Sequence, residues 1–297
     1  MTDYYVDTDN GDNGNTGLSW ADACANLDQL IRYKLAPEHG HIIHCRGVAI
    51  DDAVEANLAF AYALEIVGDY YGEPMIPLPP KYKWRPMAGA GPSFGFNEVV
   101  EAQGKHLYRN IMLIENDAGG LGGQNAFMSA VTGGTHTTFH GIGVMRSIVP
   151  AGGIAAVYAR ASSTLVISSC AFHWMNPNGG SNIITGLFRC DAGSKLLVTN
   201  CSARVDPSLN IGVINGQPDS TRMYNTIWHT NGFRAPQNGL DFSYNTGNQA
   251  ISGIATAVDN VQKTGAQILD LWQDPDNGDY RLKDTAVDEI DTGVDPT

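Results

Sequence analysis

The sequence predicts an all-β solenoid, a parallel β-helix with a capping helix at its start and an irregular capping segment at its end. Only 16% of the 297 residues are charged and 34 are glycine, a composition that suits short strands joined by many turns. From Ile42 onward, apolar runs of strand length follow one another with no helical stretch between them, which excludes a β/α barrel and a doubly wound sheet. The later runs also repeat at nearly regular steps.

The repeat is marked by one small or polar residue that returns in each run at nearly equal steps along the chain. These marker positions are Asn110, Gly141, Ser169, Asn200, Asn225 and Ser252. Steps of this size predict an architecture in which each repeat is one coil. Each coil would supply about three short strands, and the coils would stack at about 4.8 Å. Asparagine at such a turn would share amide hydrogen bonds with asparagine in the next coil.

The first 35 residues predict how the solenoid begins. Residues 4–6 predict a short strand, and residues 7–17, nearly all Asp, Asn, Thr and Gly, predict a loop. Ser19 then predicts an N-cap, with Asp22 three residues later as in a capping box. Apolar residues follow at helical spacing, which predicts a helix of about four turns over residues 20–33. We expect this helix, the only one predicted, to cap the first coil, because open strand edges invite association.

The chain ends in a polar stretch that keeps a few large apolar side chains at wide intervals. The stretch "WQDPDNGDYRLKDTAVDEIDTG" begins at Trp272 and carries no helical apolar stripe. We expect it to lay Tyr280, Leu282 and Ile290 over or along the last coils while its polar residues face water.

Both ends of the chain carry a family resemblance. "YYVDTDNGDNGNTGLSWADACANLDQLI" and "DPDNGDYRLKDTAVDEIDTG" resemble the opening and closing segments of right-handed parallel β-helix proteins of the pectate-lyase-like superfamily. The resemblance implies a single right-handed parallel β-helix domain over residues 1–297. Residues 1–35 would form the N-terminal strand, loop and cap helix, residues 36–272 the coils with a loop insertion near 73–96, and residues 273–297 the C-terminal cap. The fold hosts lyases, hydrolases, adhesins and viral spikes, so it does not by itself decide the activity.

Charge and hydropathy exclude several classes of function. The net charge of −13 argues against nucleic acid and anionic lipid as partners. The sequence contains no apolar run of 18 residues, so it predicts no membrane span. The N-terminus has neither the basic nor the apolar region of a Sec signal. We therefore expect folding in a cytoplasm, without Sec secretion. The five cysteines form no CxxC pair and predict reduced, buried thiols rather than zinc ligands.

The sequence predicts no catalytic residue. Similar polygalacturonases carry Asn-Thr-Asp, Asp-Asp, Gly-His-Gly and Arg-x-Lys motifs on successive coils. This chain has the pair Asp51–Asp52 and His140–Gly141, without the other motifs in phase. Carboxylates are sparse in the central coils, and turn formation is the favoured role for them over acid–base catalysis. They are Asp191, Asp206 and Asp219.

No cofactor or metal is predicted, with Ca²⁺ kept as an alternative. Asp7, Asp9 and Asp12 offer closely spaced oxygen ligands, but the spacing is not that of an EF-hand, so Asx turns are favoured. The histidines 39, 41 and 44 cluster without sharing one strand face, which argues against a metal site there.

Two aromatic pairs also stand out. His173–Trp174 and Trp228–His229 occupy similar points of two separate coils and predict a stacked aromatic ladder. A ladder in the core is favoured over an exposed ladder that binds sugar rings.

The segment 81–96, "KYKWRPMAGAGPSFGF", is basic and aromatic within an acidic chain. It predicts either a long loop lying on the solenoid or a contact arm that reaches an acidic or apolar neighbour. The arm would present Lys81, Tyr82, Lys83, Trp84, Arg85, Phe94 and Phe96.

Three functions remain open at this point. The favoured one is a non-enzymatic structural virion protein of a bacteriophage, a homotrimeric capsid decoration, tail spike or head fibre. It would contact major capsid or tail proteins and host surface polysaccharide, and it would reside in the virion. The second is a polysaccharide lyase or glycoside hydrolase, which predicts a carboxylate-lined groove along one face. The third is a carbohydrate-binding surface β-helix.

Overall fold

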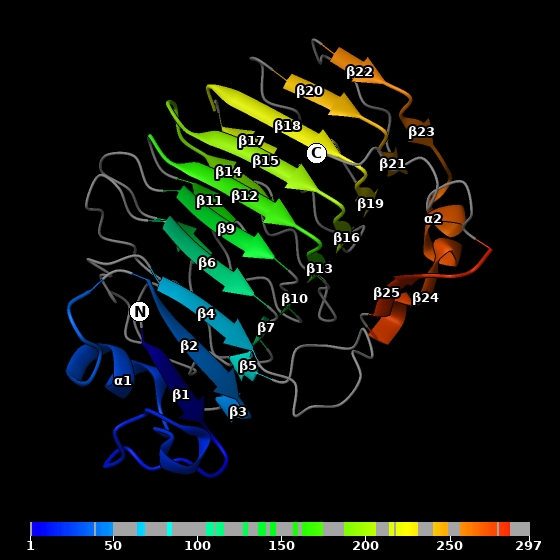
Figure 1. The fold of residues 1–297 in the computed structure, drawn as a ribbon. Helices are drawn as coiled ribbons and strands as arrows, with labels where there is room; N and C mark the ends of the chain where they lie inside the picture. Colours follow the sequence, from blue (N-terminus) through cyan, green and yellow to red (C-terminus); the bar gives the residue numbers. More distant parts are fainter. Residues whose placement is uncertain are drawn as a thin grey trace.

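The computed structural model shows a parallel β-helix in which three sheets run along the solenoid (Figure 1). The structure describes residues 2–38, 40–49, 64–68, 82–84, 105–109, 111–115, 127–129, 136–140, 143–146, 157–159, 162–174, 187–205, 214–216, 218–230, 240–248, 256–277 and 279–285. Within these residues the pairing inside each of the three sheets is parallel throughout, so the predicted fold class is confirmed.

Sheet A is the broad sheet that faces the viewer in Figure 1, and the described residues give it ten strands. In sheet order these are β1 (Asp3–Asp7), β2 (His41–Arg46), β4 (Leu64–Gly68), β6 (Lys105–Arg109), β9 (His136–His140), β12 (Thr164–Ser168), β15 (Lys195–Thr199), β18 (Ser220–Tyr224), β20 (Leu240–Ser243) and β22 (Thr256–Val258).

Sheets B and C have nine and four described strands. Sheet B consists of β3 (Val48–Ala49), β5 (Tyr82–Trp84), β7 (Ile111–Glu115), β10 (Gly143–Arg146), β13 (Ala171–Trp174), β16 (Ser202–Val205), β19 (Ile227–His229), β21 (Thr246–Gly247) and β23 (Val261–Gln262). Sheet C consists of β8 (Phe127–Ser129), β11 (Val157–Ala159), β14 (Phe188–Cys190) and β17 (Ile214–Gly216).

The core is a set of apolar rows that run parallel to the solenoid axis. The register of sheet A places one inward residue of each strand directly beside the next. The buried members of this row are Tyr4, Ile43, Ile66, Phe139, Ile167, Val198, Met223 and Phe242. Each such side chain contributes about 1.5–3 kcal/mol by leaving water. Phe172 and Phe188 join sheets B and C through an edge-to-face contact with centroids 5.2 Å apart.

One residue in a left-handed conformation makes the turn from sheet A to sheet B in successive coils. Ser169, Asn200, Asn225, Tyr244 and Asp259 have φ between 50° and 58°. Ser, Asn and Asp tolerate this region because their short side chains bond locally. Three of the predicted marker positions are thus confirmed as equivalent. Ser252, Asn110 and Gly141 lie outside the described residues, and the positions that follow Asn225 in register are Tyr244 and Asp259.

The residue after each of these turns forms a second row, and four of its five members link their coil to the coil before it; the fifth, Thr226, donates to Tyr224 O of its own coil. Cys170 and Cys201 direct their thiols to the carbonyls of Phe139 and Ile167. Further along, Asn245 and Asn260 use the same geometry. Their Nδ2 atoms donate to Met223 O at 2.9 Å and Phe242 O at 2.7 Å. Asn245 Nδ2 also donates to Asn260 Oδ1 at 3.0 Å. The predicted amide ladder therefore exists, one residue beyond the predicted turn position.

The N-terminal helix is shorter than predicted. A single 3₁₀ turn, η1 (Trp20–Asp22), is followed by an extended stretch and then by α1 (Leu27–Tyr33). The break occurs because Cys24 pairs with β1: its N–H donates to Tyr5 O at 3.1 Å, and its carbonyl accepts from Asp7 N at 2.9 Å. Ser19 makes no capping hydrogen bond. Leu27 and Leu30 are fully buried.

A second helix, α2 (Gly265–Leu271), was not predicted. Its signal is a capping box that the sequence contains: Thr264 Oγ1 accepts from Gln267 N at 3.3 Å, and Gln267 Oε1 accepts from Thr264 N at 2.8 Å. The helix leads into an antiparallel pair, β24 (Trp272–Asp274) and β25 (Asp279–Leu282), joined by the 3₁₀ turn η2 (Pro275–Asn277). We call residues 265–285 the strap. It lies along the last coils, beside sheet B (Figure 1), as predicted for Tyr280 and Leu282, while Ile290 lies outside the described residues.

The left-handed turn gives a first testable prediction. Replacing the exposed Asn200 by Val is expected to destabilise the protein by about 1–2 kcal/mol, because a β-branched residue tolerates positive φ poorly. Asn200→Gly should be nearly neutral. Urea unfolding followed by circular dichroism measures both. Ser220→Val, in the extended strand β18, is the matched control and should shift the midpoint little. Equal midpoints for Asn200→Val and wild type would contradict the assigned turn.

Candidate functional site: the outer face of sheet A

The outer face of sheet A presents three parallel rows of side chains. Along β12, burial alternates residue by residue, so every second side chain points outward. The row nearest the left-handed turns, here called the polar row, contains Arg109, His140, Ser168, Thr199, Tyr224 and Ser243. The middle row contains Leu107, Thr138, Val166, Leu197, Arg222 and Asp241. The third contains His136, Thr164, Lys195 and Ser220.

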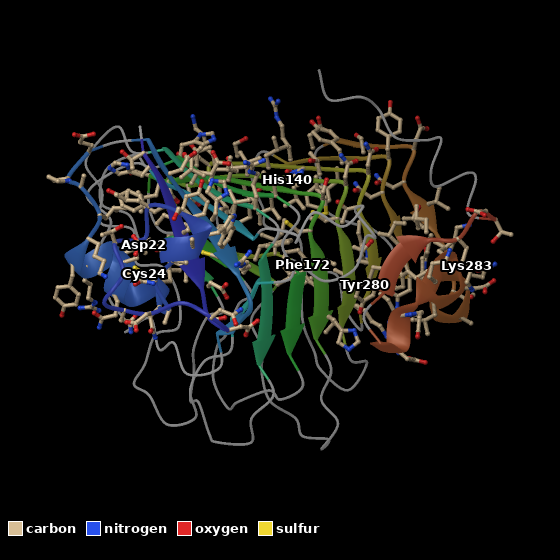
Figure 2. All side chains as sticks on the ribbon, turned by 60° about the horizontal axis from the view of Figure 1, so that its bottom comes forward. Asp22, Cys24, His140, Phe172, Tyr280 and Lys283 are labelled. Atoms are coloured by element: carbon tan, nitrogen blue, oxygen red, sulfur yellow. The ribbon has the colours of Figure 1, made fainter. Side chains whose placement is uncertain are left out.

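The polar row is held together by contacts between neighbouring coils. His140 Nδ1 lies 2.9 Å from Ser168 Oγ, on the outer side of the sheet (Figure 2). Tyr224 OH donates to Asp241 Oδ2 at 2.9 Å, and Ser243 Oγ donates to Asp241 Oδ1 at 3.0 Å. Burial and then the adjacent Asp241 carboxylate raise the pKa of the Tyr224 hydroxyl, so it stays protonated and acts as a donor.

The central strands of this face, β9 to β18, carry Lys195 and Arg222 and no carboxylate at their outward positions, in a chain with a net charge of −13. Lys195, Arg222 and His140 are exposed, and the Arg109 side chain is 41% exposed. Carboxylates lie towards the two ends of the face: Asp3 is exposed on β1, Glu65 pairs with Arg109, and Asp241 accepts the two hydroxyls. Local cationic charge on an acidic protein favours an anionic partner at this face.

Glu65 and Asp241 are too far apart to act as a catalytic pair. Glu65 lies on β4 and Asp241 on β20, six strand steps away in sheet order. At about 4.8 Å a step they are separated by roughly 29 Å. Glycosidases need their two carboxyl groups about 5–9.5 Å apart. Glu65 and Asp241 therefore cannot act together in two-carboxylate hydrolysis.

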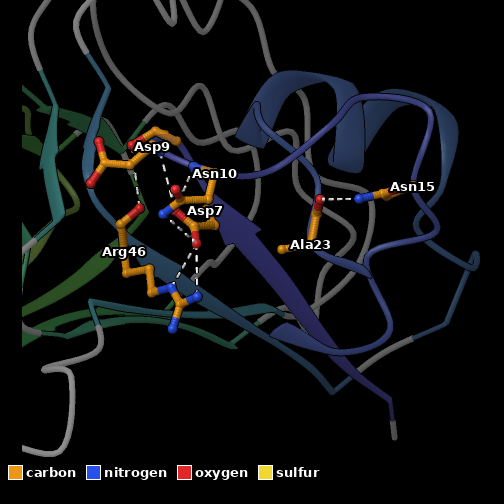
Figure 3. Close-up of polar contacts among 7 residues, drawn as sticks. Asp7, Asp9, Asn10, Asn15, Ala23 and Arg46 are labelled. Atoms are coloured by element: carbon orange, nitrogen blue, oxygen red, sulfur yellow. Dashed lines mark hydrogen bonds and ion pairs between the residues drawn. The ribbon is translucent and has the colours of Figure 1, made fainter. Parts of the chain in front are cut away.

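Asp7, one of the three aspartates for which Ca²⁺ was kept as an alternative to Asx turns, holds the N-terminal loop together (Figure 3). Its carboxylate is buried, accepts from Arg46 Nε at 2.9 Å and lies 2.8 Å from Arg46 NH2. It also accepts from the backbone N–H groups of Asp9 and Asn10 at 3.1 Å. Asp12 Oδ1 accepts from Gly14 N at 2.7 Å, as an Asx turn does. Within the described residues, no group of three or more His, Cys, Asp or Glu side chains is placed to hold a metal ion.

The strap covers a row of ionisable side chains on the outer face of sheet B. His173, Arg204 and His229 stand side by side on β13, β16 and β19, each at most 9% exposed. His173 Nδ1 shares a hydrogen bond with Tyr280 OH, and Arg204 NH1 donates to Asp276 Oδ1 at 2.7 Å. Burial, reinforced by the Arg204 charge, lowers the pKa of His173 to about 4. The same two causes lower the pKa of His229.

This register corrects the predicted aromatic ladder. His173 and His229 do share a row, but Arg204 separates them. Trp228 falls in the row of Phe172, whereas Trp174 falls in the row of Val205. The two predicted pairs lie two turns of the solenoid apart, so a coil of different residues stands between them.

The predicted contact arm is partly replaced by a strand. Tyr82, Lys83 and Trp84 form β5, which pairs with β3 on one side and β7 on the other. The backbone of these residues therefore belongs to sheet B and not to a projecting arm. Lys81, Arg85, Phe94 and Phe96 lie outside the described residues. Contact of the segment with a partner stays a prediction.

Other sequence candidates have structural roles. Asp219 Oδ1 accepts from Gly193 N at 2.9 Å in the turn before sheet A, and the Asp191 carbonyl accepts from Ser194. Asp206, Asp51 and Asp52 lie outside the described residues, as does His39. His41 is buried whereas His44 stacks on Tyr5, so these two histidines use opposite faces. All five cysteines are free and buried, as predicted, and burial raises the pKa of Cys190 to about 12.

Comparison with known proteins finds two solved structures of related shape. A rhamnogalacturonan lyase aligns with 83% of this chain and 74% of its own, at 12% identity and a TM-score of 0.45. A GH136 lacto-N-biosidase from Eubacterium ramulus aligns with 89% of this chain and 68% of its own, at 12% identity and a TM-score of 0.27. No protein-family model matches the sequence, and no curated protein matches it. None of the described helices has the length and apolarity needed to cross a bilayer.

The Asp7–Arg46 pair gives a prediction about acid stability. Burial raises the pKa of Asp7, but the hydrogen bonds from Arg46 and from the backbone of Asn10 and Asp9 outweigh it, so the net pKa is lowered. The stability that Asp7 contributes is therefore present above about pH 4 and lost as the pH falls through the lower folded value. Asp7→Asn should lower the unfolding free energy at pH 7 by about 1–3 kcal/mol.

The pH dependence separates this effect from general damage to the loop. The difference between wild type and Asp7→Asn should shrink as thermal unfolding is measured from pH 7 down to pH 2.5. Asp12→Asn, an exposed neighbour in the same loop, is the matched control and should differ little from wild type at any pH. A constant deficit for Asp7→Asn across this range would contradict the assigned role of the charge.

Proposed function

We propose that this protein is a non-catalytic β-helix that binds an acidic polysaccharide along the outer face of sheet A. The observation that carries the proposal is the register of the sheet, which places Arg109, Lys195 and Arg222 on one solvent-facing surface of an acidic chain. Cations distributed along the sheet, on β6, β15 and β18, suit a ligand whose negative charges also lie along its length.

The chemistry of the three rows fits a sugar polymer better than a compact anion. Ser168, Tyr224 and the imidazole of His140 offer hydrogen bonds along one border of the face. The middle row offers aliphatic surface from Val166 and Leu197. Binding sites commonly combine an apolar floor with a few placed polar groups. A chain lying parallel to the solenoid axis would meet aliphatic side chains on β12 and β15 and then the charge of Arg222 on β18.

The setting proposed for this activity is the bacteriophage particle predicted from the sequence, with host surface polysaccharide as the ligand. Binding without hydrolysis fits adhesion in that setting. The separation of Glu65 and Asp241 supports this reading over a two-carboxylate hydrolase. Polysaccharide lyase or glycosidase activity is the competing outcome, and product assays on acidic polysaccharides would reveal it.

Removing two exposed cations tests the binding face. The double variant Lys195→Ser/Arg222→Ser should weaken binding of an oligogalacturonate at least tenfold by titration calorimetry in 50 mM salt. Wild-type affinity should also fall as salt is raised, because exposed charges are screened. Arg32→Ser/Lys263→Ser, which removes the same charge at the two ends of the solenoid, is the matched control and should bind as wild type does. Equal weakening in both variants, or no binding by wild type, would sink the proposal.

A second candidate is assembly into a homotrimer through the same sheet. The observation that favours it is the outward aliphatic stretch Leu107, Val166 and Leu197, because interface cores are apolar with a polar rim. The outer face of sheet B is already occupied by the strap over β13–β19. Light scattering should then give about three times 31.8 kDa, and Val166→Lys should return the mass to that of one chain. A wild-type mass of one chain would remove this candidate.

A further inference from the structure

The strap is attached to sheet B in two chemically different ways. Its first part is anchored by apolar contacts: Ile268 and Trp272 are fully buried and pack with Ile227 of β19. Gly265 begins this part beside His229, so close that a Cβ there would meet His229 Nε2 at 2.8 Å. These apolar contacts do not depend on protonation.

The second part, residues 275–282, is here called the polar limb: Tyr280 and Leu282 join the apolar cluster around Trp272, and the limb's side-chain contacts with β13 and β16 are made by ionisable groups. Asp276 is 82% exposed, yet it is the carboxylate that pairs with Arg204, whose side chain is 11% exposed. Tyr280 bonds to His173 and packs edge-to-face on Trp272 at 4.9 Å. His173 and Arg204 of the sheet are buried; of their two partners from the limb, Tyr280 is buried as well and Asp276 is exposed.

Beneath the strap lies a row of three side chains that can all carry positive charge. His173, Arg204 and His229 are direct neighbours in the parallel register, so each imidazole stands about 4.8 Å along the sheet from a permanent cation. Among the described side chains, the ionisable groups that face this row from the strap are Asp276 and Tyr280. Protonating both histidines would create three adjacent positive charges against one carboxylate.

We infer that the polar limb is a proton-released cover over an anion-binding pair made of His173 and Arg204, next to which His229 lies beneath Gly265. A protonated imidazole under the limb is held beside Arg204 with little water, which is unfavourable. Moving the limb away hydrates both charges, while Ile268 and Trp272 keep the strap attached. The uncovered His173 and Arg204 then offer two adjacent cations to the sulfate or carboxylate groups of an oligosaccharide.

The pH window follows from the imidazole of His173. Its pKa is about 4 under the limb and about 6.5 when exposed to water. The closed limb is therefore fully stable above about pH 6.5 and loses stability as the pH falls towards 4. Binding of an anion to the uncovered pair should take up protons, since the ligand favours the charged imidazole.

Hydrogen exchange with mass spectrometry tests the release. Between pH 7.5 and 4.5, the protection factor of the peptide covering residues 275–285 should fall at least tenfold, while peptides from β12 and β15 should keep theirs. The double variant His173→Phe/His229→Phe should show no such loss, because neither ring takes up a proton. If that variant folds poorly, His173→Gln alone should at least halve the loss. Unchanged protection of wild type at pH 4.5, or the same loss in the variants, overturns the inference.

Capture of an anion is measured in the Lys195→Ser/Arg222→Ser background, where the binding face of sheet A is disabled. A heparin hexasaccharide, which stays ionised at pH 4.5, should bind at least tenfold more tightly at pH 4.5 than at pH 7.5. Calorimetry in two buffers of different ionisation enthalpy should show proton uptake. Adding Arg204→Gln should abolish this acid-dependent binding. The inference is overturned if the limb is released at pH 4.5 but the hexasaccharide does not bind, or if acid-dependent binding survives Arg204→Gln. Binding to the outer face of sheet A is measured separately at pH 7.5, so failure of one proposed site can be distinguished from failure of the other.

Discussion

The structure depends on one constraint, the in-register stacking of each coil on the coil before it. A parallel strand has no tight turn to set its partner, so something else must hold the register. Here the turn between sheets A and B holds the register in two ways. Asn200 and its equivalents take the left-handed conformation, and in four of the five turns the residue that follows bonds to a carbonyl of the preceding coil, as Asn245 and Asn260 do. A slip of one residue would turn the core row towards water.

Because register is preserved, the outward side chains also form rows, and the two larger sheets use theirs differently. Sheet A leaves Lys195, His140 and Arg222 exposed to solvent. Sheet B covers His173 and its neighbours with the strap, which supplies the carboxylate of Asp276 to the buried Arg204. An uncompensated buried cation is costly, so covering that row requires an anion from somewhere. The strap therefore acts as an internal ligand of sheet B. Its carboxylate is the kind of group that an external anion would offer to sheet A.

The fold could be predicted from the sequence because its signals are local and repeated. Gly-rich turns, short apolar runs and recurring small polar residues each report on one coil, and many coils agree. The helix over residues 20–33 was predicted too long because Cys24 forms a long-range pair with β1 that helical spacing cannot reveal. The helix α2 was missed although Thr264 and Gln267 form a capping box. The strap was predicted to lie along the coils, but its contacts with His173 and Arg204 join parts of the chain that are far apart in sequence.

The candidate face was harder to predict because unequal coil lengths hide it. The sequence steps between successive left-handed turns shorten towards the C-terminal end, so residues that share a row share no constant spacing. Arg109, His140 and Ser168 look unrelated in the sequence and become neighbours only after each strand is placed in register. The same argument explains the failed aromatic ladder, where Trp174 and Trp228 occupy different strand positions and so belong to different rows. In this solenoid, candidate functional residues have to be sought along the rows of outward side chains and not in short sequence motifs, because a long ligand would contact a row.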